Sequence, residues 1–112
     1  MDIMKTLDMR KSSENERKAN NLIECMYHAF NVGDNVGKLY SCRARIVFYN
    51  DYFVLVSYNT PIAIYDYYAE TLYDLLRPVW GYTATSNMHV YKFKAWLTEN
   101  DYPITNFVRF IK

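Results

Sequence analysis

Residues 44–66, ARIVFYNDYFVLVSYNTPIAIYD, decide what kind of fold this chain adopts. The stretch contains three runs of β-branched and aromatic residues, a composition that favours strands. The three runs are residues 44–48, 52–57 and 62–66. Tyr49, Asn50 and Asp51 lie between the first two runs, and the segment SYNTP leads from the second run into the third. Turns this short predict that the strands form an antiparallel meander.

A short segment and then a long helix are expected downstream of the meander. Residues 71–76 fit either a fourth strand or one helical turn, and we favour the strand. Thr85 or Ser86 is placed to cap a helix that runs to about residue 100. This helix has an apolar stripe, which predicts that it covers one face of the sheet. The stripe consists of Val90, Phe93 and Leu97.

The end of the chain has a helical period of its own. Ile104, Phe107, Val108 and Ile111 stand at i, i+3, i+4 and i+7, and Pro103 lies near the start of the segment. This spacing favours a short helix over a strand.

A first helix is predicted over residues 13–30, upstream of the meander. Ser13 and Glu16 have the spacing of a capping box, and the apolar residues that follow keep the helical period. These apolar residues are Ala19, Leu22, Ile23, Met26 and Phe30. Residues 33–37, GDNVG, separate the helix from the meander. Residues 1–9 are expected to be a loosely ordered arm.

The sequence therefore predicts one α+β domain that spans residues 1–112. Its parts are an N-terminal helix, a three- to four-stranded antiparallel sheet, a covering helix and a short C-terminal helix. A chain of 112 residues with 51% hydrophobic and 22% charged residues fits one domain with one core.

The net charge and hydropathy of the chain bear on whether it binds nucleic acid or a membrane. The formal net charge is +1, so no overall field steers the protein toward nucleic acid or an anionic membrane. The N-terminal segment has no apolar signal region, and no stretch approaches 18 uninterrupted apolar residues. We expect a cytoplasmic protein with no membrane partner, in which Cys25 and Cys42 stay reduced.

Catalytic and metal-binding patterns are weak. A zinc site would need Cys25, His28, Cys42 and His89, but neither Cys42 nor His89 has a ligand-type residue close by. The sequence has no nucleophile elbow, no phosphate-binding glycine loop and no HExxH motif. We therefore expect no enzyme, no metal and no cofactor.

Tyrosines and acids interleave after the third predicted strand. With 12 tyrosines, the chain has more of these amphipathic rings than a core requires, and such rings are common both at core rims and at binding surfaces. The partner-binding candidates are Tyr65, Tyr67, Tyr68, Glu70, Tyr73 and Asp74. The alternative is a solvated face whose acids protect an edge from aggregation.

A second candidate surface lies on the long helix. His89, Lys92 and Lys94 could contact phosphates, and Trp96 lies one turn beyond Lys92. The alternative is an ordinary exposed stripe of cations. These three residues are the nucleic-acid-binding candidates.

The chain contains the segments VSYNTPIAIYD, at residues 56–66, and GYTATSNMHVYKFKAWLTENDY, at residues 81–102. Both segments resemble a family of short phage and mobile-element proteins from Gram-positive and gut bacteria. The family pattern is a strand with S-Y-x-T, an apolar strand, and a helix start with T-x-T/S-x-x-H-I/V-x-x-F-L. The matching residues are Ser57, Tyr58, Thr60, Thr83, Thr85, Ser86, His89, Val90 and Phe93. Pro61 and an insertion around residues 67–78 depart from the pattern.

The resemblance implies a phage or prophage context and carries over no catalytic residue. The expected function is non-catalytic inhibition of a host defence nuclease by direct protein binding in the bacterial cytoplasm. An anti-CRISPR protein that blocks a Cas effector is the named candidate. The alternative is a small nucleic-acid-binding or regulatory phage protein. The sequence does not indicate the oligomeric state.

Overall fold

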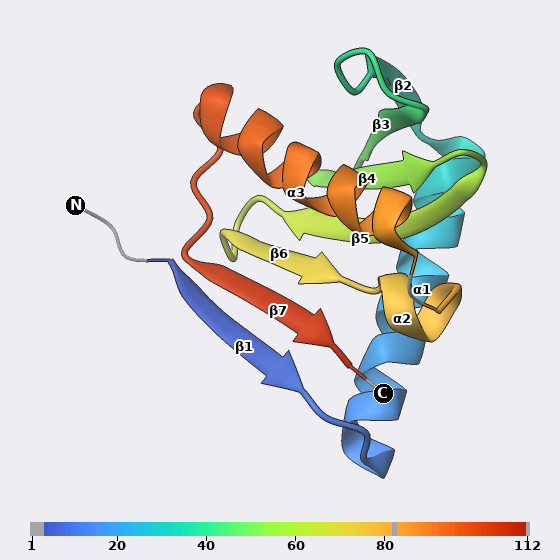
Figure 1. Ribbon diagram of the computed structural model, residues 1–112, viewed down its shortest axis with the longest axis vertical. Coiled ribbons are helices and arrows are strands. Elements are labelled where there is room, and N and C mark those ends of the chain that lie inside the picture. Colours follow the sequence, from blue (N-terminus) through green and yellow to red (C-terminus); the bar gives the residue numbers. More distant parts are fainter. Residues whose placement is uncertain (1–3, 82, 112) are drawn as a thin grey trace.

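A mixed sheet of seven strands runs through the middle of the molecule, between helices on its two faces (Figure 1). The computed structural model describes residues 4–81 and 83–111. In chain order the elements are β1 (Lys5–Met9), α1 (Ser13–Val32), β2 (Asp34–Lys38), β3 (Ala44–Tyr49), β4 (Tyr52–Ser57), β5 (Thr60–Asp66), β6 (Thr71–Asp74), α2 (Leu76–Val79), α3 (Ala84–Glu99) and β7 (Asn106–Phe110).

The order of the strands in the sheet is β1-β7-β6-β5-β4-β3-β2. Strands β2 to β6 form an antiparallel meander, whereas β7 runs parallel to both of its neighbours, β6 and β1. The predicted turn between β3 and β4 is present. Asn50 and Asp51 both have left-handed φ angles, 50° and 67°, which is the requirement of a tight hairpin turn and suits these two residue types.

Two apolar layers hold the helices on the sheet. Helix α3 packs with Val90, Phe93 and Leu97 on one face. Helix α1 packs with Ala19, Met26 and other apolar residues on the opposite face. Strands β4 and β5 are buried on both faces, which explains their almost continuous apolar sequence.

Both long helices are confirmed. Ser12, one residue before the predicted cap, accepts a hydrogen bond of 3.1 Å from the backbone nitrogen of Asn15 at the start of α1. Thr83 caps α3 in the same way through Ser86 N, so neither Thr85 nor Ser86 is the cap. Helix α1 ends at Gly33, where a Cβ atom would lie 2.5 Å from the Ala29 carbonyl oxygen.

The predicted sheet of three to four antiparallel strands is wrong, because three further segments join the meander. Residues 106–110 form β7 and not a helix. Residues 5–9, expected in a loose arm, form β1. Residues 34–38, expected to be a break, form the edge strand β2 with a bulge between Asn35 and Gly37. Residues 71–74 form a strand as favoured, and α2 begins at Leu76.

None of the helices in the described residues is long and apolar enough to span a membrane.

Candidate protein-binding surface

Two turns that are distant in sequence meet at one end of β4 and β5. The backbone nitrogen of Tyr67, after β5, donates a hydrogen bond of 3.2 Å to the carbonyl oxygen of Asp51, between β3 and β4. The Asp66 carboxylate accepts hydrogen bonds from the backbone nitrogens of Tyr68 and Ala69, at 3.0 and 3.2 Å. This Asx turn fixes the direction in which the chain presents the two tyrosines.

The segment between α3 and β7 is tied to the same place. Thr105 N donates to the Glu70 carbonyl oxygen at 2.8 Å. The Tyr102 ring lies edge-on to Tyr67, with ring centroids 6.0 Å apart, and stacks on Trp96 at 6.1 Å. Tyr102 also contacts the buried ring of Phe53 at 4.8 Å. The surface rings are therefore joined to the core by an unbroken series of aromatic contacts.

We call this region the acidic tyrosine surface. It consists of Asp51, Asp66, Tyr67, Tyr68, Glu70, Asp101 and Tyr102. Tyr67 is 45% exposed and Tyr68 is 79% exposed, although both rings are large and apolar. Within residues 4–81 and 83–111, none of the four carboxylates forms an ion pair. Exposed aromatic rings beside unpaired carboxylates fit a partner that is both apolar and basic.

The local charge also acts on a buried neighbour. Burial, reinforced by the nearby Glu70 carboxylate, raises the pKa of Tyr65 to about 12. Its hydroxyl donates a hydrogen bond of 2.6 Å to the Pro103 carbonyl oxygen. Tyr65 therefore stays neutral and holds the loop that carries Asp101 and Tyr102.

The structure brings together three of the six predicted partner-binding residues, Tyr67, Tyr68 and Glu70. Tyr65 is fully buried, and Tyr73 lies half-buried on the face that α1 covers. Asp74 is buried too; its carboxylate accepts a hydrogen bond of 3.0 Å from Leu76 N, and burial raises its pKa. These three side chains cannot contact a partner at this surface.

Sequence reasoning missed Asp51, Asp101 and Tyr102 as members of the surface. The one available signal was the residue type of Asp51 and Asp101, because aspartate is common at turns. Both residues have left-handed φ angles in the structure. Their proximity to Tyr67 depends on strand pairing that the sequence pattern did not reveal.

The three nucleic-acid-binding candidates do not form a shared surface. His89 is buried, and its Nδ1 lies 2.7 Å from the Ser57 hydroxyl. Lys94 has its ammonium group 5.5 Å from the ring centroid of Tyr91 and 5.3 Å from that of Phe107. Lys92 is half-buried. A phosphate therefore cannot reach His89, so the three residues do not act together as a phosphate site.

Ser57, Ser86 and His89 form a buried polar network. The hydroxyls of Ser57 and Ser86 are 3.1 Å apart, and burial, with a smaller effect of Lys92, lowers the pKa of His89. A serine beside a histidine can act as a nucleophile and its base. Here both side chains are almost inaccessible, so the network offers no open position to a substrate. Its hydrogen bonds instead join the β4–β5 turn to α3.

The residues that a zinc site would need do not gather either. Among the described residues, no three histidine, cysteine, aspartate or glutamate side chains gather as metal ligands. Cys25 and Cys42 are both free and half-buried. Burial and the nearby Asp66 raise the pKa of the Cys25 thiol, which disfavours its reactive thiolate.

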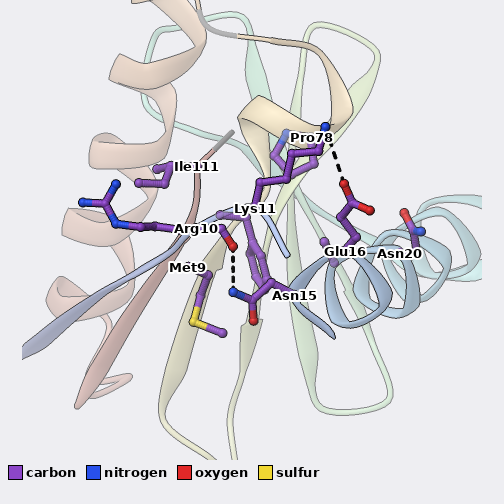
Figure 2. A pocket seen from close by; sticks show the side chains of 10 residues that line it. Met9, Arg10, Lys11, Asn15, Glu16, Asn20, Pro78 and Ile111 are labelled. Atoms are coloured by element: carbon purple, nitrogen blue, oxygen red, sulfur yellow. Dashed lines mark hydrogen bonds and ion pairs between the residues drawn. The ribbon is translucent and has the colours of Figure 1, made fainter. Parts of the chain in front are cut away.

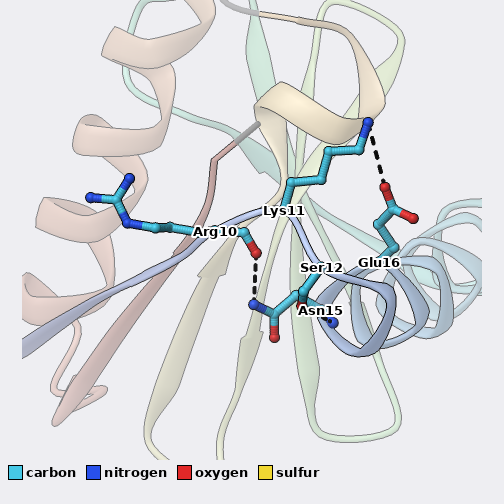
Figure 3. A network of polar contacts seen from close by, with 5 residues as sticks. All are labelled: Arg10, Lys11, Ser12, Asn15 and Glu16. Carbon is cyan, nitrogen blue, oxygen red and sulfur yellow. Dashed lines mark hydrogen bonds and ion pairs between the residues drawn. The ribbon is translucent and has the colours of Figure 1, made fainter.

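A cavity of about 310 Å³ lies between the ends of β1 and β7 and the start of α1 (Figure 2). The carboxyl ends of parallel strands often border ligand sites. Here three of the polar side chains already have partners in the protein (Figure 3): Lys11 pairs with Glu16 at 3.7 Å, and the Asn15 side chain donates to the Arg10 carbonyl oxygen at 2.7 Å. The Glu16 carboxylate also disfavours an anion. The cavity is therefore a weaker candidate for ligand binding than the acidic tyrosine surface.

The chain matches no protein-family model, no curated protein and no solved structure.

Proposed function

We propose that this protein is a non-catalytic inhibitor that binds a larger host protein through the acidic tyrosine surface and covers a basic, nucleic-acid-binding groove. The observation that carries the proposal is the coincidence of two exposed tyrosines with four carboxylates that have no ion-pair partner in the described residues. Tyrosine is enriched among the residues that dominate binding energy. Carboxylates bring charge complementarity to a basic groove.

The rigidity of the surface supports the same proposal. Tyr67 is held by Asp51 through a backbone hydrogen bond and by Tyr102 through a ring contact. A surface that is already ordered loses less conformational entropy when a partner binds. The target class, a host defence nuclease such as a Cas effector, comes from the resemblance of residues 56–66 and 81–102 to phage and mobile-element proteins.

The test is inhibition of DNA cleavage by a panel of purified Cas effectors loaded with guide RNA. We expect stoichiometric inhibition of at least one effector and binding that calorimetry can measure. The variant Asp51→Asn, Glu70→Gln and Asp101→Asn removes three charges and keeps the side-chain shapes at these left-handed positions. Each close charge pair contributes at least about 1.5 kcal/mol, so the triple variant should bind more than about 100-fold more weakly.

The matched control replaces three exposed carboxylates elsewhere, Glu14→Gln, Glu24→Gln and Asp34→Asn. It changes the net charge by the same amount and should inhibit like the wild type. Equal loss in both triple variants would mean that only net charge matters. Inhibition that survives in the first triple variant would refute the assignment of the surface, and inhibition of none of the effectors would refute the target class.

A further inference from the structure

A second open cleft lies at the opposite end of β4, where the β2–β3 and β4–β5 turns meet. Its volume is about 430 Å³. Lys38 and Arg45 are directly paired on β2 and β3, and the backbone nitrogen of Tyr58 donates to the Arg43 carbonyl oxygen at 2.8 Å. We call this region the basic cleft, and its polar and aromatic lining consists of Asn35, Lys38, Arg43, Arg45, Tyr58 and Asn59.

The charge of the basic cleft is of one sign. Among the described residues that line it, three are cationic and none has a carboxylate. None of the three forms an ion pair within the described part of the chain. The Arg45 guanidinium lies 5.2 Å from the ring centroid of Phe30, which holds it in place, whereas Lys38 and Arg43 are exposed. A group of cations without ion-pair partners attracts phosphates.

Tyr58, which lines the cleft, forms an exposed aromatic pair with Trp80. Tyr58 is 44% exposed and Trp80 is 46% exposed, and their rings meet edge-on at 6.4 Å. Tyr58 has a φ of 57°, which is uncommon for an aromatic residue at a turn position that favours glycine. Backbone strain of this kind is concentrated at binding and catalytic sites.

The network of Ser57, Ser86 and His89 contacts the Tyr58 ring through His89. The His89 ring lies 5.8 Å from it, and the Ser57 hydroxyl holds His89 through its Nδ1. The conformation that presents Tyr58 is therefore anchored to both β4 and α3.

We propose that the basic cleft binds single-stranded nucleic acid. Lys38, Arg43 and Arg45 contact the phosphates, and an unpaired base stacks on Tyr58 or Trp80. Cationic grooves that carry aromatic platforms bind single strands with little sequence preference. Duplex bases are stacked on each other and cannot use these rings, and an acidic protein would need the cations but not the rings.

The test is fluorescence anisotropy with a labelled thymidine oligonucleotide of about 12 residues, a length that covers one such site. Three phosphate contacts predict that log K falls with log salt concentration with a slope of about −2. The variant Lys38→Ala with Arg43→Ala should reduce the slope to about −0.7, because one contact remains. The variant Tyr58→Asn, which suits a left-handed φ, should weaken binding about tenfold at an unchanged slope.

The matched control removes two exposed cations elsewhere, Arg10→Ala with Arg17→Ala, and should keep the wild-type slope. Three results would overturn the proposal: no binding at about 50 mM salt, equal affinity for the duplex of the same length, or equal competition by polyglutamate. The last result would assign the cleft to an acidic protein. These variants leave the acidic tyrosine surface intact, so inhibition of a nuclease and binding of a single strand can fail independently.

Discussion

Groups of opposite charge lie beside the two ends of strands β4 and β5. The end with the β3–β4 and β5–β6 turns has the carboxylates and exposed tyrosines of the acidic tyrosine surface. The end with the β4–β5 turn has the three cations of the basic cleft. A net charge of +1 conceals this separation, because the sum takes no account of position. Overall charge alone therefore says little about which partners such a small domain binds.

The two ends are also held to the molecule by different forces. Apolar ring contacts from Phe53 to Tyr102 and Trp96 hold the acidic tyrosine surface. Buried hydrogen bonds among Ser57, Ser86 and His89 hold the basic cleft. Packing of this kind is almost insensitive to pH, whereas a buried histidine is not. The following variants separate the two anchors.

Removal of the central ring should have the largest effect. Phe53→Ala leaves a cavity beneath Tyr102 and should lower the free energy of unfolding by about 3–5 kcal/mol. Urea denaturation followed by circular dichroism measures this loss. The control Tyr68→Ala removes an exposed ring from the same surface and should change stability by less than about 0.5 kcal/mol. A loss of under about 1 kcal/mol for Phe53→Ala would show that the core does not anchor this surface.

Disruption of the polar anchor should have an intermediate effect. Ser57→Ala leaves Nδ1 of His89 without its shortest partner in a buried position, which should cost about 1–3 kcal/mol. Thermal unfolding measures the loss, and the exposed Ser41→Ala serves as the control. The variant should also weaken binding at the basic cleft and leave the acidic tyrosine surface unaffected. Equal stability of the two serine variants would contradict an anchoring role for the network.

The smallest effect is a dependence of stability on pH. The pKa of His89 is lowered in the folded state, so the unfolded state binds the proton more readily. Stability from this group is fully present above the unfolded pKa of about 6.5 and is lost as the pH falls below it, by at most about 1.4 kcal/mol per pH unit. Urea titrations above and below that value should show the loss in the wild type.

The variant His89→Asn is the control for this pH dependence. It should be less stable than the wild type, and its free energy of unfolding should lack the part of the pH dependence that His89 contributes. Asp74, whose pKa is raised by burial, acts in the opposite direction, because its protonation favours the folded state. It is present in both proteins, so the difference between the two slopes reports His89. Parallel slopes would show that His89 does not titrate between the folded and unfolded states.

Local sequence signals predicted the centre of the fold and failed at its margins. The β3–β4 hairpin and the two long helices have strong patterns, and all are present. Strand β7 was mistaken for a helix because Phe107 and Val108 are buried on opposite faces of the sheet, and such a strand loses the alternation that would identify it. Strands β1 and β2 are largely exposed edges, and their pairing depends on distant residues.

The same limit applies to the two surfaces. The sequence groups Tyr67, Tyr68 and Glu70 because they lie within four consecutive positions. Asp101 and Tyr102 join them only through contacts made after α3. The sequence pattern does not indicate the basic cleft, because Lys38 belongs to a strand that was not predicted. The cations of the cleft lie near Tyr58 only when β2, β3 and β4 are paired.

The place of β7 in the sheet has a consequence for how the protein is made. Lys5 pairs with Asn106, and β7 separates β1 from every other strand. On the ribosome, residues 5–9 therefore emerge before the other strands of this sheet and have no neighbouring strand until residues 106–110 have been synthesised. Pairing across so much of the chain is slow. The meander can form during translation, but the sheet is completed only when its most distant segments meet.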